Sequence, residues 1–191
     1  MSPDAGIVAD LQRYLQEGRD SILRALDGLS DYDVRRPMTP TGTNLLGLVK
    51  HLTGVELGYL STAVGRPAPS LPWEEDGSVW ENGDMWVRAD ESREWVLGLY
   101  RTAWEHSDRA IAELPLDHPA APPWWPEETR ASTFGHLLVR VVAETAQHAG
   151  HADILRETID GQAGRDHEQT GDEAAWAEYV ATVQAAADAH R

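Results

Sequence analysis

Four long segments of this chain repeat their apolar side chains every three or four residues, which is the spacing of one face of an α-helix. No segment shows the strict apolar and polar alternation of a half-buried strand. An amphipathic helix has to bury its apolar face, and four such helices can bury theirs against one another. The periodicity therefore predicts an all-α four-helix bundle. The expected helices cover about 4–29, 43 or 44 to 64, 90–114 and 132–159.

Two long connections, 66–90 and 115–131, lie between the later helices and are rich in proline and tryptophan. Connections of this length in a compact domain usually cross the fold or carry function, so they allow a topology other than simple up and down. The sequence predicts a bundle domain over residues 1–165. An alanine-rich fifth helix, within 166–191, is expected to pack on the bundle through Trp176, Tyr179, Val180 and Val183.

Charge and composition exclude several classes of partner. The 191 residues carry a formal net charge of −16, so we expect the chain to repel nucleic acid and anionic membranes. No stretch is long and apolar enough to span a bilayer, and the N-terminus lacks the pattern of a secretory leader, so a cytoplasmic location is expected. There is no cysteine, which excludes disulfides and thiolate ligands. Any thiol chemistry needs a small-molecule thiol.

Ionisable side chains interrupt the apolar face of the last bundle helix. Glu144, His148 and His151 lie at steps of four and three residues, on the same line as Leu137, Val141 and Leu155. Burying such groups costs several kcal/mol unless something pairs with them. A bound metal ion would be such a partner, since helical bundles build metal sites from inward-facing histidines and carboxylates.

The second helix offers a further ligand, His51, on the line of Leu48, Val55 and Gly58. Spacing alone leaves two ligand sets open: His51 and His148 with Glu144, or His51 and His148 with His151. Three protein ligands leave open coordination positions, as in catalytic zinc sites. The other interpretation is ordinary structure, with core histidines and Glu144 paired to Arg140 at i, i+4. Tyr100 and Trp104, inward on the third helix, are either pocket walls or plain core.

The segments around these residues resemble a known superfamily. Thr43–Leu52, Val64–Pro67, Gly135–Arg140 and Ala143–Glu157 are similar to the DinB-like superfamily, and more closely to its branch related to mycothiol-dependent maleylpyruvate isomerase and mycothiol S-transferases. The resemblance covers most of residues 5–160. It implies a four-helix bundle with crossover connections and a divalent ion, usually zinc or nickel, held by three residues.

The resemblance also implies a choice of ligands. Many relatives use three histidines, and a glutamate at the position of Glu144 resembles the mycothiol-dependent isomerase branch. The implied ligands are therefore His51, Glu144 and His148. His151 stands beside them, and Arg140, Tyr100 and Trp104 are expected to contact substrate or support the ligands.

What the resemblance implies for function is a metal-dependent S-transferase or thiol-dependent isomerase that acts on a small molecule. The thiol would be mycothiol or another low-molecular-weight thiol, and a homodimer is allowed. Two alternatives stay open: a hydrolase that uses metal-bound water, and a non-enzymatic helical module for binding or stress response. Fold alone does not separate the three.

Overall fold

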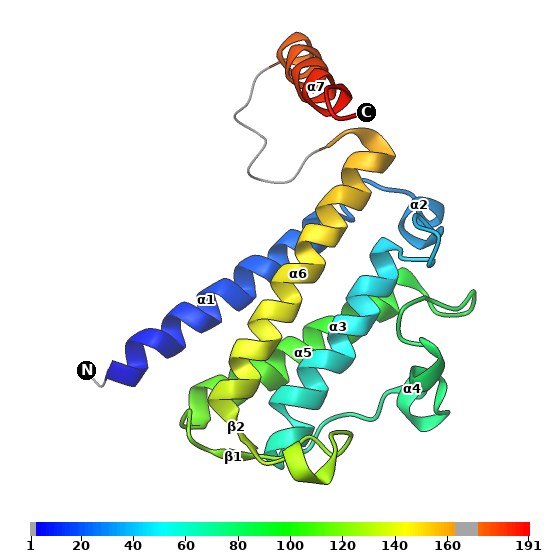
Figure 1. The fold of residues 1–191 in the computed structure, drawn as a ribbon. Helices are drawn as coiled ribbons and strands as arrows, with labels where there is room; N and C mark the ends of the chain where they lie inside the picture. Colours follow the sequence, from blue (N-terminus) through cyan, green and yellow to red (C-terminus); the bar gives the residue numbers. More distant parts are fainter. Residues whose placement is uncertain (1–2, 163–171) are drawn as a thin grey trace.

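The predicted all-α bundle is confirmed. A computed structural model describes residues 3–162 and 172–191. Helix α3 packs against α5 and α6, and α1 packs along α6 (Figure 1). These four elements form the bundle: α1 (Pro3–Arg24), α3 (Leu45–Leu60), α5 (Arg93–Glu113) and α6 (Phe134–Asp160).

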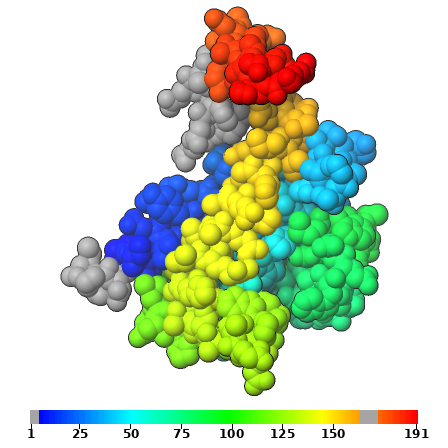
Figure 2. Space-filling model, in the orientation of Figure 1, coloured from blue at the N-terminus to red at the C-terminus, as the bar shows by residue number. Residues whose placement is uncertain are grey.

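The connections of the bundle set its topology. Helices α3 and α5 run in the same direction, while α1 and α6 run the opposite way (Figure 1). Neighbours that run the same way cannot be joined by a tight turn, so the chain between α3 and α5 has to return along the full length of the bundle. This is the physical reason for the long connection at 66–90. In the space-filling view this segment, turquoise to green, covers one side of the bundle, and the yellow-green 115–131 segment closes one end (Figure 2).

Short elements occur in the predicted loops and at the ends of predicted helices, so that α3 ends at Leu60, not at 64, and α6 begins at Phe134, not at 132. The first helix ends at Arg24, not near 29, because a turn leads to Gly28 at φ 74° and then into a separate short helix. The strands are two residues long, too short for any alternation to appear in the sequence. The short elements are α2 (Asp31–Arg35), η1 (Thr62–Val64), α4 (Pro72–Glu75), η2 (Ser78–Glu81), η3 (Glu127–Thr129), and the antiparallel pair β1 (Pro119–Ala120) and β2 (Ser132–Thr133).

The starts of the two helices that carry the candidate ligands are defined by side-chain caps. The Asn44 side chain accepts a hydrogen bond from Gly47 N, and the Thr133 side chain accepts one from His136 N. Each cap satisfies a backbone N–H that has no partner inside the helix. Asn44 and Thr133 are thus the N-caps of α3 and α6.

Helix α3 is the central element, because it is buried on nearly all sides. Its buried polar side chains therefore need partners. Glu56 and Arg19 of α1, both with fully buried side chains, form a two-pronged ion pair, with Arg19 Nε to Glu56 Oε1 at 3.0 Å. Arg19 also bonds Asp108 of α5 at 2.8 Å and lies over the Trp104 ring. One arginine thus joins α1, α3 and α5.

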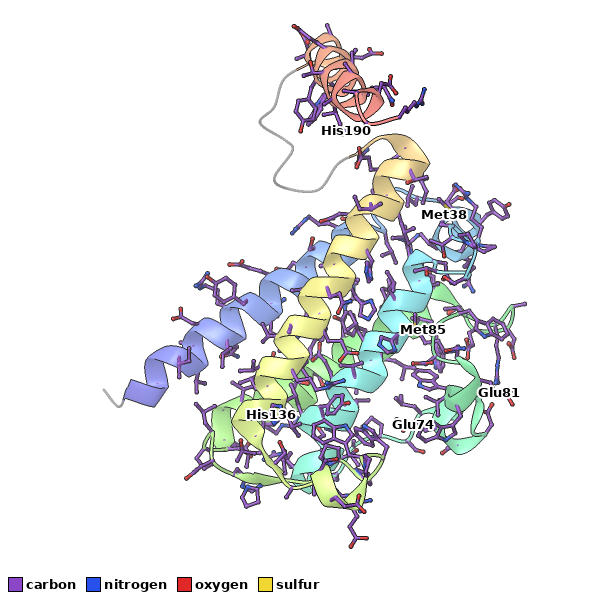
Figure 3. All side chains as sticks on the ribbon, viewed as in Figure 1. Met38, Glu74, Glu81, Met85, His136 and His190 are labelled. Carbon is purple, nitrogen blue, oxygen red and sulfur yellow. The ribbon has the colours of Figure 1, made fainter. Side chains whose placement is uncertain are left out.

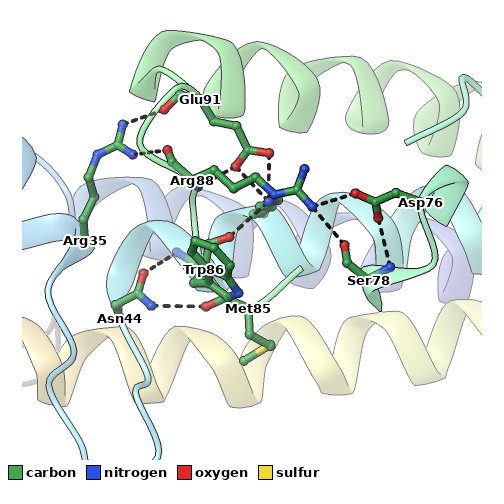
Figure 4. Close-up of polar contacts among 10 residues, drawn as sticks. Arg35, Asn44, Asp76, Ser78, Met85, Trp86, Arg88 and Glu91 are labelled. Atoms are coloured by element: carbon green, nitrogen blue, oxygen red, sulfur yellow. Dashed lines mark hydrogen bonds and ion pairs between the residues drawn. The ribbon is translucent and has the colours of Figure 1, made fainter. Parts of the chain in front are cut away.

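Side chains at α3 hold the 66–90 connection in place by donating hydrogen bonds to the backbone of that connection. Asn44 Nδ2 donates to Met85 O at 3.1 Å, and Lys50 Nζ donates to Trp86 O at 3.0 Å (Figure 4). Lys50 also pairs with Glu91 at 2.8 Å. The approach at Met85 needs a glycine, since a Cβ at Gly47 would lie 2.0 Å from Met85 O. The residues just before Met85 are therefore fixed against α3.

The fifth predicted helix exists as α7 (Glu173–Asp188). Of the residues expected to pack on the bundle, Tyr179, Val180 and Val183 are 59%, 60% and 51% exposed, and Trp176 is partly buried. The expected domain boundary at 165 and 166 lies outside the described residues. None of the helices in the described ranges combines the length and apolar character that crossing a membrane requires.

Candidate metal centre

The three implied ligands meet where α3 packs on α6. One nitrogen or oxygen from each of His51, Glu144 and His148 lies within 4.8 Å of the others, and among the described residues this is the group suited to hold a metal ion. His51 Nε2 is 3.3 Å from Glu144 Oε1, and the His51 and His148 rings meet edge to face at 5.0 Å between centroids. The candidate ligands that were predicted on two separate helices therefore lie together in one group.

The donor set fits a divalent ion. With metal–ligand distances of about 2.0–2.2 Å, two ligand atoms on a tetrahedral ion lie roughly 3.4 Å apart. The observed 3.3 Å from His51 Nε2 to Glu144 Oε1 matches this spacing, and the three ligand atoms all lie within 4.8 Å of one another. Two imidazoles and a carboxylate suit zinc, nickel, iron or manganese.

Asp84 is a candidate site residue that the sequence did not indicate. Its Oδ2 lies 2.7 Å from His51 Nδ1, with the Asp84 side chain only 13% exposed. When Nδ1 donates a hydrogen bond to this carboxylate, Nδ1 keeps the ring proton. The lone pair of the neutral ring is then on Nε2, the nitrogen on the side of Glu144, where it can bind a metal ion. No periodic pattern marked Asp84, because it sits in the 66–90 connection between Gly83 and Met85.

The electrostatics of the metal-free site follow from these contacts. Burial lowers the pKa of His51, but the hydrogen bonds to Asp84 and Glu144 outweigh it and raise that pKa to about 9. The hydrogen bond to His51 lowers the pKa of Glu144. Burial, together with the charges of His51 and His151, lowers the pKa of His148 to about 4. At neutral pH, Glu144 and His148 are thus ready to bind a cation, and His51 must release a proton.

Two of the predicted neighbours lie beside the ligands. His151 is exposed, and its Nδ1 is 3.3 Å from His148 Nδ1. The guanidinium of Arg140 is 3.6 Å from Glu144 Oε2 and lies over the Tyr59 ring at 5.0 Å. Each of these two residues contacts one candidate ligand, but neither belongs to the group of three that could hold the ion.

Tyr100 and Trp104 are not among the residues that line the cavity beside the ligands. They pack in the core, which is the second of the two interpretations that the sequence left open. Tyr100 is fully buried, and its ring packs edge to face on Trp104 at 5.1 Å between centroids. Trp104 in turn lies against Arg19. The reason is that α5 packs on the face of α3 that carries Glu56, whereas His51 lies on another face.

A cavity of about 560 Å³ opens beside the ligands. Its walls include aromatic side chains from both long connections and from α3. The sequence showed that the two connections are rich in tryptophan, but not that these rings line one cavity. The residues that line it are His51, Gly54, Val55, Gly58, Tyr59, Thr62, Trp73, Glu74, Val79, Trp80, Asp84, Pro123, Trp124 and Glu144.

A bundle that presents histidine and glutamate from two helices beside a cavity defines the class of DinB-like helical proteins with a candidate metal centre. A family model described as Mycothiol-S-transferase matches residues 10–161, so the chain belongs to this family. The match confirms the resemblance found in the sequence and spans the whole bundle. No curated protein matches the chain significantly.

Proposed function

We propose that this chain is a divalent-metal-dependent S-transferase that joins mycothiol, or a similar small thiol, to an electrophilic small molecule. The observation that carries the proposal is the group of His51, Glu144 and His148 at the edge of a cavity, in a chain of the Mycothiol-S-transferase family. Reversible addition of the same thiol to an activated double bond would make the site an isomerase.

The residues divide the work as follows. His51, Glu144 and His148 would hold the ion, with zinc or nickel expected. When bound, such an ion lowers the pKa of a coordinated thiol and supplies a thiolate at neutral pH. Asp84 orients His51 by accepting a hydrogen bond from its Nδ1. The chain has no cysteine, so the sulfur nucleophile has to come from the small-molecule thiol.

The cavity wall also serves the reaction by excluding water. Trp73 is only 2% exposed, and the Tyr59 hydroxyl accepts a hydrogen bond from Trp124 Nε1 at 3.4 Å. These rings line the cavity beside the candidate ligands. A thiolate shielded in this way is less hydrated and a stronger nucleophile.

The test combines metal analysis with a transfer assay. Purified protein is expected to bind about one divalent ion per chain, and to transfer mycothiol to a haloalkyl fluorophore. His148→Ala should lose both properties, whereas the matched His151→Ala variant should keep the ion. Turnover that needs no thiol would point to hydrolysis instead. Absence of metal binding, with His148→Ala unchanged in activity and stability, would contradict the proposal.

A further inference from the structure

The lining of the cavity carries information about the molecule that reacts with the thiol. Its aromatic walls are positioned by backbone features of α3. A Cβ at Gly58 would lie 2.9 Å from Cη2 of Trp124, and one at Gly54 would lie 3.5 Å from Nε1 of Trp73. Two glycines one turn apart therefore let two indole rings approach the α3 backbone, on the same side of the helix as the cavity.

These walls are fixed to different degrees. Trp73 is buried, packs edge to face on Trp95 at 6.4 Å, and has Lys50 Nζ 4.8 Å from its ring centre. Trp124 is anchored through its Nε1 on the Tyr59 hydroxyl. Trp80, by contrast, is 78% exposed. The cavity wall thus ranges from the buried Trp73, through the hydrogen-bonded and 39% exposed Trp124, to the largely exposed Trp80.

Negative charge prevails in the lining, with the protonated His51 of the metal-free protein as its one cation among the described lining residues. Three carboxylates contribute to it, from Glu74, Asp84 and Glu144, and no lysine or arginine does. Figure 3 shows Glu74 at α4, on the side that faces α3. Three carboxylates outweigh the two positive charges of a divalent ion.

The cations that adjoin the walls do not change this balance. Lys50 is paired with Glu91 at 2.8 Å, and Arg140 is 3.6 Å from Glu144. Each lies against an aromatic residue of the wall, Lys50 on Trp73 and Arg140 on Tyr59. An anion inside the cavity would therefore meet carboxylates and ring faces, both of which repel negative charge, while the one cation of the lining, His51, is already bonded to Asp84 and Glu144.

We propose that the electrophile accepted here is an uncharged molecule with a flat apolar or aromatic body, and that Glu74 acts as a selectivity residue against anionic acceptors. This inference rests on the proposed function in treating the bound molecule as the acceptor of the thiol. The selectivity with which the cavity binds molecules can nevertheless be measured without turnover. A volume of about 560 Å³ lies within the usual range for small-molecule sites and admits a bicyclic body.

The experiment measures binding of a matched pair of probes, 2-naphthamide and 2-naphthoate. They share shape and differ in charge at pH 7. Binding is followed by isothermal titration calorimetry and by tryptophan fluorescence, on the full chain with EDTA present, so that a carboxylate cannot bind by ligating an ion. The amide should bind at least about tenfold more tightly than the carboxylate.

Two variants with matched controls assign the effect. Glu74→Gln should tighten naphthoate binding roughly threefold to tenfold and leave the amide unchanged, while the neighbouring Glu75→Gln should change neither. Trp80→Ala should weaken the amide about threefold to tenfold, while Trp86→Ala, also an exposed tryptophan outside the lining, should not.

The outcomes separate this inference from the proposed function. Equal or tighter binding of naphthoate, no binding of either probe, or no response to Glu74→Gln overturns the selectivity of the cavity. If the metal-loaded protein then still transfers thiol to anionic acceptors, the proposed function survives alone. If the amide binds selectively and no thiol transfer occurs, the proposed function fails and the selectivity stands.

Discussion

His51 Nδ1 lies 2.7 Å from Asp84 Oδ2, while Nε2 of the same ring lies 3.3 Å from Glu144 Oε1. The imidazole is therefore held from both edges, by a connecting segment on one side and by α6 on the other. Carboxylates that hold a histidine in this way fix its tautomer and raise its basicity toward a metal. The ring is positioned before any ion binds.

Asp84→Ala should weaken metal binding about 10- to 100-fold, because the Nδ1 proton of His51 loses its acceptor and the ring its orientation. Affinity is measured by competition with a chromophoric chelator. Glu81→Ala is the control, since Glu81 is exposed in the same connection (Figure 3). An Asp84→Ala variant that matches wild type in affinity would show that the carboxylate plays no positioning role.

The stability of the metal-free protein should depend on the proton of His51. The pKa of His51 is raised to about 9 in the folded state, so the folded protein holds this proton more tightly than the unfolded chain does. The stabilisation is complete below the unfolded value of about 6.5. It should be lost as pH rises through about 9.

The measurement for this pH dependence is the Tm of EDTA-treated protein across that range. His51→Gln should lack the alkaline decrease seen for wild type, because glutamine does not titrate. Identical pH profiles for the two proteins would refute the assignment. Metal-loaded wild type should also lack the decrease, since the ion replaces the proton.

Arg19→Met should lower the free energy of unfolding by about 3–5 kcal/mol, because it leaves the fully buried Glu56 without its cation. Arg13→Met removes two exposed ion pairs, with Asp10 and Glu17, and should cost less than about 1 kcal/mol. The double variant Arg19→Met with Glu56→Met should recover part of the loss. Urea denaturation provides the values, and equal effects of the Arg19 and Arg13 variants would argue against a structural ion pair.

Gly47→Ala should destabilise the protein by about 1–3 kcal/mol, because its Cβ would collide with the backbone at Met85. The displaced segment carries Asp84, so metal affinity should fall as well. Gly98→Ala is the matched control, since nothing lies within 4 Å of a Cβ there and alanine favours the helix by about 1 kcal/mol. Unchanged metal affinity in a folded Gly47→Ala protein would show that the position of the 66–90 connection does not affect the metal site.

The sequence by itself determined what depends on local spacing. Helical periodicity predicted the bundle, and the steps between Leu137, Glu144 and His148 put the latter two on an inward face. The motifs around His51 and Glu144 indicated the family, which the family match over residues 10–161 confirmed. These features are readable because a helix repeats its geometry every few residues, so neighbours in sequence decide which side chains share a face.

Only the tertiary structure decided what depends on contacts between distant residues. Asp84 reaches His51 because Asn44 and Lys50 hold the backbone of residues 85 and 86 on α3, and no local pattern encodes those bonds. Tyr100 is core and not pocket wall, because the packing of α5 on α3 selects the face that it meets. Periodicity tells which face of a helix is buried; the partner that buries it is set by long-range packing.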